Sequence, residues 1–137
     1  MRVEAVRKVI RAALLLAGLT VCASVAAQTG HPAKGSWLGH WGPEGEQHRL
    51  FLLLDWEDRT LTGTINPGPR AVTIESTTID YATWTLTLEA EMPAATGEKR
   101  HWLAVGKLEN LGSWKNRRYS GEYHFGAETG RFEVTLQ

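Results

Sequence analysis

From Gly35 to the end of the chain, apolar and polar residues alternate in short runs. In the run 83–91 every even-numbered residue is apolar and every odd-numbered residue is threonine or glutamate, and the run 131–136 repeats this pattern with Phe132, Val134 and Leu136. Successive side chains of a strand point to opposite faces of a sheet. The alternation therefore predicts strands with one apolar and one polar face, as in an antiparallel sheet.

Turn-forming segments divide this region into eight predicted strands. The segment 66–69 is Asn-Pro-Gly-Pro, and similar turns recur at intervals of about 8 to 14 residues, which is typical of all-β sandwiches and barrels. Glycine also stands near the middle of several runs, where it favours bends of a coiled sheet. The predicted strands are 36–41, 48–56, 60–66, 71–81, 83–91, 99–109, 117–125 and 130–136.

These strands predict an all-β fold over residues 35–137. We expect an eight-stranded antiparallel up-and-down meander that closes into a barrel, with a β-sandwich as the alternative. Closure would remove the free edges of the sheet. The run 50–54 is apolar on both faces of its strand, which predicts burial on both sides, beneath a terminal segment or an oligomer partner.

The first 27 residues have the composition of an export signal. Residues 1–11 carry four basic side chains, residues 12–23 carry no charge, and Val25-Ala26-Ala27 suits cleavage by a signal peptidase. The apolar run of about 12 residues is shorter than the roughly 20 that cross a bilayer as a helix. We predict a signal peptide over 1–27, a disordered leader over 28–34, and a secreted or periplasmic product without a stable transmembrane anchor.

Cleavage after Ala27 also changes the chemistry of the chain. Cys22 is the only cysteine, so the mature protein would contain no disulfide. Lipidation of Cys22 is the alternative, although Val21 stands where a lipobox has a small residue. Removing 1–27 takes away four of the 15 basic and one of the 15 acidic residues, which leaves 11 and 14 and a net charge of about −3. This mildly acidic chain has no basic run, so nucleic acid is not an expected partner.

Short motifs at both ends of the meander resemble those of the calycin group, which includes the lipocalins and avidins. Gly35-Ser36-Trp37 is similar to their first-strand signature, 61–64 to the third strand of avidins, and 119–123 with 126–128 to their seventh strand and next turn. The resemblance implies a barrel that holds one small apolar ligand and is entered at one end. It also implies a late arginine packed across Trp37, either Arg131 or Arg118.

Aromatic residues supply the candidate binding site. The chain has six tryptophans, and each indole combines a large apolar surface with one N–H donor, which suits the wall of a ligand pocket. The same side chains could instead fill the barrel completely. The predicted ligand-binding residues are Trp37, Trp41, Trp84, Trp102, Tyr119 and Tyr123.

The sequence contains no Gly-x-Ser-x-Gly elbow, no phosphate-binding loop and no His-Glu-x-x-His motif. We therefore predict no catalytic residue, metal or cofactor, and an enzyme is not expected. The leading hypothesis is an exported protein that binds a partly apolar molecule in an aromatic-lined interior. The alternatives are an envelope or extracellular inhibitor or scaffold that uses the outer surface, and a small barrel lyase or isomerase. An outer-membrane barrel is disfavoured because the chain lacks long loops and a terminal aromatic residue.

Overall fold

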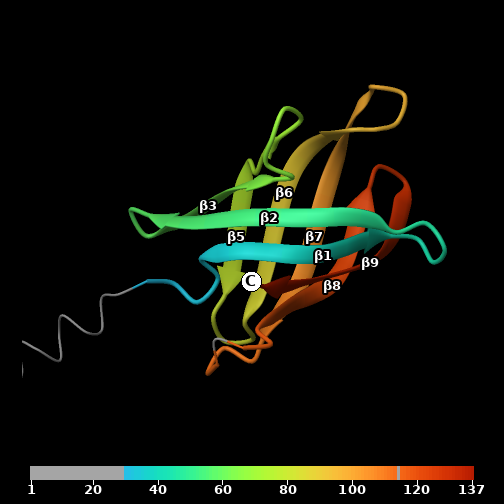
Figure 1. The fold of residues 1–137 in the computed structure, drawn as a ribbon. Coiled ribbons are helices and arrows are strands. Elements are labelled where there is room, and N and C mark those ends of the chain that lie inside the picture. Colours follow the sequence, from blue (N-terminus) through green and yellow to red (C-terminus); the bar gives the residue numbers. More distant parts are fainter. Residues whose placement is uncertain (1–29, 114) are drawn as a thin grey trace, which may run out of the picture. The chain divides into compact units, whose positions relative to one another are not determined.

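The computed structural model describes residues 30–113 and 115–137 and divides the chain into two units, 1–31 and 32–137. The predicted signal peptide over 1–27 lies outside the described residues. The unit Pro32–Gln137 consists of strands joined by turns (Figure 1). Across the described ranges, no helix has the length and apolar character needed to span a membrane.

All strands of this unit belong to one antiparallel sheet of nine strands, which confirms the predicted all-β meander. The order across the sheet is β4-β3-β2-β1-β9-β8-β7-β6-β5, so strands that follow one another in sequence lie side by side except β4 and β5, and the first and last strands also pair. The strands are β1 (Gly35–Gly42), β2 (His48–Glu57), β3 (Thr60–Ile65), β4 (Val72–Thr73), β5 (Ser76–Asp80), β6 (Thr85–Pro93), β7 (Lys99–Glu109), β8 (Arg118–Phe125) and β9 (Glu128–Leu136).

The ninth strand arises because the predicted strand 71–81 is divided. Its first part, β4, pairs with β3, and its second part, β5, pairs with β6. The division falls at Ile74 and Glu75, where the Ile74 N–H donates to the Gly63 carbonyl and the Glu75 N–H donates to the Glu89 carbonyl. The segment 72–80 therefore pairs with β3 through its first residues and with β6 through its last residues. The change of partner occurs between Ile74 and Glu75.

The sheet is consequently not closed, and the predicted eight-stranded closed barrel is not observed. β4 and β5 are the two edge strands of the sheet, and no backbone ladder joins β5 to β3. The hydroxyl of Thr77 on β5 donates a hydrogen bond to the Leu61 carbonyl on β3 at 2.7 Å. A side chain therefore bridges the gap that a backbone ladder would fill in a barrel.

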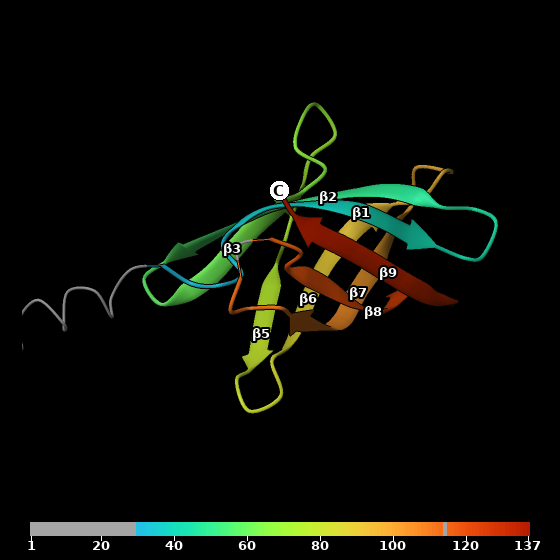
Figure 2. The same cartoon turned by 60° about the horizontal axis from the view of Figure 1, so that its bottom comes forward.

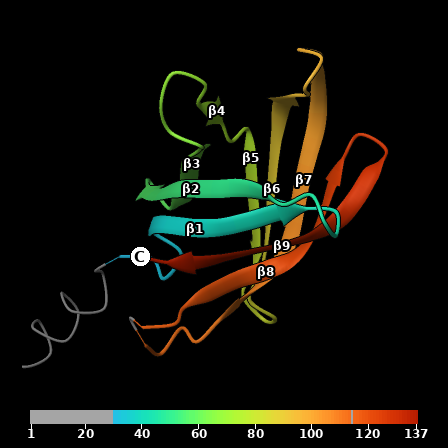
Figure 3. The ribbon, with the colours of Figure 1, turned by 45° about the vertical axis from the view of Figure 1, so that its right-hand side comes forward.

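The sheet curls so that one of its faces is enclosed. Figure 1 shows β1 and β2 crossing in front of β5, β6 and β7 at a steep angle, and Figures 2 and 3 show the same crossing from other sides. The enclosed face is apolar, because inward and outward side chains alternate along each strand as the sequence predicts. The largest fully buried side chains are Trp37, Trp102, Tyr119, Tyr123, Leu50, Leu52, Ile65, Leu86, Leu88 and Val134.

Two paired glycines allow the curled sheet to close around its core. Gly106 on β7 faces Gly121 on β8, and Gly121 faces Phe132 on β9. A Cβ atom on Gly106 would lie 2.7 Å from the Phe132 ring, and one on Gly121 would lie 2.0 Å from the Val105 carbonyl oxygen. The glycines therefore leave the space that the Phe132 ring occupies.

We expect Gly121→Ala to destabilise the fold by about 1–3 kcal/mol or more, because its methyl group would overlap backbone atoms that cannot move independently. Gly112→Ala is the matched control, since a Cβ atom there meets nothing within 4 Å, and its effect should stay within about 0.5 kcal/mol. Urea unfolding followed by tryptophan fluorescence measures both. Equal midpoints for the two variants would show that the Gly106–Gly121 contact is unimportant.

Candidate functional site

The structure places five of the six predicted ligand-binding residues in the core. Trp37, Trp102, Tyr119 and Tyr123 are completely buried, and Trp41 is 6% exposed. Trp84 lies apart from them in the turn between β5 and β6 and is only partly buried. Burial alone does not distinguish a binding residue from a core residue, so the hydrogen bonds of each side chain have to be compared.

Trp37 and Tyr119 have the contacts of structural core residues. The Trp37 indole N–H donates to the Ala33 carbonyl at 2.9 Å, and the Tyr119 hydroxyl donates to the Leu86 carbonyl at 2.8 Å. Burial raises the pKa of Tyr119 well above its usual value, so this hydroxyl remains a donor. Both polar groups are satisfied within the protein and have no need of a ligand.

The segment Pro32–Lys34 covers the end of the interior near Trp37, which we call the leader end. Ala33 is completely buried, and the Arg117 guanidinium donates to the carbonyls of Pro32 and Leu111 at 2.8 and 2.9 Å. Within the predicted leader 28–34, the carbonyls of Pro32 and Ala33 accept hydrogen bonds from Arg117 and Trp37. Neither arginine predicted to pack across Trp37 is found there, because Arg131 pairs with Gly42 at the opposite end of β1 and Arg118 pairs with Glu109 and Glu133.

Arg117→Ala should destabilise the protein by about 2–4 kcal/mol, because it removes charge-assisted hydrogen bonds and leaves two carbonyls without their donor. Arg118→Ala is the neighbouring control. Its guanidinium lies at the surface, where ion pairs contribute little to stability, so its unfolding midpoint should change only slightly. Thermal unfolding compares the two, and an equal loss in both variants would contradict this role for Arg117.

Trp84 has an unusual backbone conformation. Its φ angle is +54°, a region that bulky side chains rarely occupy, and its ring makes an edge contact with Tyr81 at 5.3 Å between centroids. Its carbonyl accepts the Leu108 N–H at 2.9 Å, so the turn is tied to β7. Trp84 therefore belongs to the leader end and does not share a site with Trp41 or Trp102.

The remaining three predicted residues form one aromatic cluster around Trp41. The Trp41 ring lies 4.9 Å from Tyr123 and 6.2 Å from Trp102, with the ring planes inclined at 82° and 75°. Phe125 and His48 also contact Trp41, at 5.4 and 4.8 Å between ring centroids. The sequence analysis did not include these two residues in the site. Phe125 could have been found from its alternation with Tyr123, whereas His48 requires knowledge of the β1–β2 register.

We call the group of Trp41, Trp102, Tyr123 and Phe125 the Trp41 cluster. It lies towards the end of the sheet that carries the turns at 43–47, 94–98 and 126–127, opposite the leader end. Trp41 and Phe125 are 6% and 9% exposed, and Met92 at the same end is 6% exposed. The cluster is therefore buried, and only a small part of Trp41 and Phe125 contacts solvent.

The Trp102 indole N–H is a buried donor without an acceptor. Its Nε1 atom has no hydrogen-bond partner among the described residues, although the side chain is completely buried. An unsatisfied buried donor costs about 1–3 kcal/mol and is unusual in a native core. The contrast with Trp37, whose N–H is paired, marks the Trp41 cluster as a place where an acceptor is missing.

Tyr123 connects the cluster to the start of β9. Its hydroxyl donates to the Glu128 carboxylate at 3.1 Å. Desolvation, the hydrogen bond to Glu128 and the negative charge of that carboxylate together raise the pKa of Tyr123 to about 12, with desolvation the largest cause. The phenol thus stays neutral and keeps its role as a donor.

Stability should fall as the pH rises from about 10 to about 12. The ordinary pKa of tyrosine is 10.0, so in this range the unfolded chain loses a proton that folded Tyr123 retains, and deprotonation favours unfolding. Urea midpoints measured between pH 9 and 11.5 should show this decline, and Tyr123→Phe should make it shallower. An unchanged pH dependence in the Tyr123→Phe variant would contradict the raised pKa.

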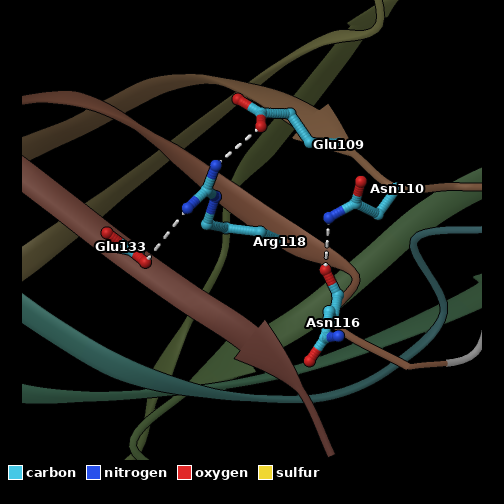
Figure 4. A network of polar contacts seen from close by, with 5 residues as sticks. All are labelled: Glu109, Asn110, Asn116, Arg118 and Glu133. Atoms are coloured by element: carbon cyan, nitrogen blue, oxygen red, sulfur yellow. Dashed lines mark hydrogen bonds and ion pairs between the residues drawn. The ribbon is translucent and has the colours of Figure 1, made fainter.

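A separate group of charges lies on the outer face of the sheet. Arg118 donates to Glu109 at 2.8 Å and lies 3.7 Å from Glu133, while the Asn110 side chain donates to the Asn116 carbonyl (Figure 4). Arg118, Glu109 and Glu133 help to line an open groove of about 1060 Å³ over β1, β9 and β8. None of the six predicted ligand-binding residues lines this groove.

The described residues contain no group of three histidine, cysteine, aspartate or glutamate side chains placed to hold a metal ion. No family model, curated protein or solved structure matches the chain. Arguments about function therefore rest on the geometry of the Trp41 cluster and of the outer face.

Proposed function

We propose that this protein is an exported binding protein for a small, mostly apolar molecule with one hydrogen-bond acceptor, and that the molecule binds at the Trp41 cluster. The observation that carries this proposal is the buried Trp102 N–H without an acceptor. A ligand carbonyl or ether oxygen would satisfy this donor, and the surrounding rings would bury the apolar part of the ligand.

The position of the cluster supports entry of a ligand from the rim. The leader end is covered by Pro32–Lys34, whereas Trp41, Phe125 and Met92 retain some exposure at the other end. The cluster rings contact one another, so a ligand has to displace side chains in order to enter. Met92 is suited to this movement because its unbranched side chain adopts many shapes at little cost.

Export and a barrel-like interior are also part of this proposal. Export rests on the basic, apolar and small-residue segments of 1–27, and removal of that segment would leave a short leader before Pro32. A barrel-like interior rests on the pairing of β1 with β9 and on the Thr77 bridge between β5 and β3. Together these features describe a sheet that encloses one end of a binding site and leaves the other accessible.

A fluorescent naphthalene ketone, 6-propionyl-2-dimethylaminonaphthalene, tests the proposal. It offers an apolar body and one carbonyl acceptor, and we expect it to bind in a 1:1 complex with a blue-shifted emission. Trp102→Phe should weaken binding roughly 3- to 10-fold, because one hydrogen bond is lost while the apolar surface remains. The matched probe is 2-dimethylaminonaphthalene, which lacks the carbonyl, and its affinity should be the same for both proteins.

Trp37→Phe serves as the control variant, since the Trp37 N–H is already paired inside the protein. It should alter stability more than probe affinity. Native mass spectrometry of protein purified from its own source should also reveal a reproducible excess mass from the natural ligand. Absence of that mass, together with absence of probe binding, would overturn the proposed function.

A further inference from the structure

The strand β2 has an apolar outward face as well as an apolar inward face. Leu50, Leu52 and Leu54 are buried in the core, whereas Phe51 and Leu53 point outward. Leu53 is 44% exposed. Among the described residues, the other exposed large apolar side chains are Tyr81 and Val105. The run 50–54 was predicted to be buried on both faces of its strand. Within one chain, only the inward face is buried by the core.

The exposed apolar residues on this face are contiguous. Leu38 on β1 lies directly opposite Phe51, and both are partly buried, while Leu53 lies two residues further along β2. We call Leu38, Phe51 and Leu53 the β2 patch. Small polar residues, Ser36 on β1 and Thr64 on β3, flank Leu53 on either side, so nothing large separates the patch from solvent.

The charges at the two ends of the patch have a symmetrical arrangement. Arg49 and Asp55 are exposed, point outward like Phe51 and Leu53, and lie three residues before and three residues after Leu52. A two-fold axis that passes over Leu52, parallel to the sheet and perpendicular to β2, would place two copies face to face with Phe51 of one copy on Leu53 of the other. The same rotation would place each Arg49 near Asp55 of the other copy. Asp55 lies 3.6 Å from Lys34 of its own chain, but its side chain is 52% exposed and is therefore accessible to a second cation. The face is thus self-complementary in charge and in apolar character.

A hollow beside Leu53 adds complementarity of shape. It has a volume of about 530 Å³, and its walls include Leu53, Asp55, Thr62 and Thr64. Lys34 and the backbone of Gly63 also line it. In the two-fold arrangement Phe51 of the other copy lies over Leu53, next to this hollow, so its ring has a place to enter.

We propose that the β2 patch is the interface of a symmetrical dimer of this chain. This inference does not depend on the proposed ligand, because the patch lies on the opposite face of the sheet from the Trp41 cluster. The patch is smaller than a standard protein interface, so we expect a dissociation constant in the micromolar range or weaker. The dimer therefore forms where the protein is concentrated.

Sedimentation equilibrium of the protein expressed from its full coding sequence tests the dimer, at concentrations from about 1 to 500 µM. We expect the average mass of the wild type to rise with concentration. Leu53→Lys should abolish this rise, whereas Val105→Lys should not, although Val105 is also an exposed apolar residue of a strand. A wild type that remains monomeric at every concentration, or equal behaviour of the two lysine variants, would overturn the proposal.

Charge reversal tests the two-fold pairing itself. Arg49→Asp and Asp55→Arg should each weaken self-association at least fivefold, because each homodimer then contains two pairs of like charges. An equimolar mixture of the two variants restores both opposite-charge pairs, so it should associate more tightly than either variant alone. Circular dichroism confirms that each variant folds. A mixture that associates no better than its components would show that these residues do not face each other.

Discussion

Pairing between the first and last strands is the constraint on which the rest of this structure depends. β1 pairs with β9 from Trp37–Leu136 to Gly42–Arg131, and the Gln137 N–H donates to the Ser36 carbonyl beyond the ladder. This pairing joins residues about a hundred positions apart, so the curl of the sheet is set by contacts that no local segment can form. The enclosed core, the covered leader end and the accessible rim all follow from it.

The enclosed aromatic side chains differ in their hydrogen bonding. Trp37 and Tyr119 have partners inside the protein and hold the leader end together. Trp102 is equally buried but lacks an acceptor. A low-dielectric interior makes an unpaired donor costly, and this cost separates the Trp102 indole from the equally buried Trp37 indole. Apolar surface alone would not have distinguished these residues.

The outer face of the sheet contains two regions of different character. Over β8 and β9, Arg118 bridges Glu109 and Glu133, so the charges there compensate one another within one chain. Over β2 the outward Phe51 and Leu53 lie between Arg49 and Asp55, which are spaced symmetrically about Leu52, and Asp55 also pairs with Lys34. The first region is polar throughout, whereas the second leaves apolar side chains partly exposed between its charges.

The sequence by itself determined the strands and the direction of their side chains. Alternation in 83–91 and 131–136 depends only on the period of a strand, so the predicted positions agree closely with β6 and β9. It also identified Trp41, Trp102 and Tyr123 as inward aromatic residues. It did not identify His48 as their neighbour, because contact across strands depends on register, whereas the alternation of Phe125 with Tyr123 already placed Phe125 on the same face.

Only the tertiary structure decided which end of the interior is covered and where the sheet is interrupted. The order of Pro32–Lys34 comes from Arg117, a residue 85 positions away from Pro32 in the chain. The division of 71–81 at Ile74 and Glu75 comes from competition between β3 and β6 for the same segment. Local sequence sets which face of a strand is apolar, but long-range hydrogen bonds and packing decide what each face meets.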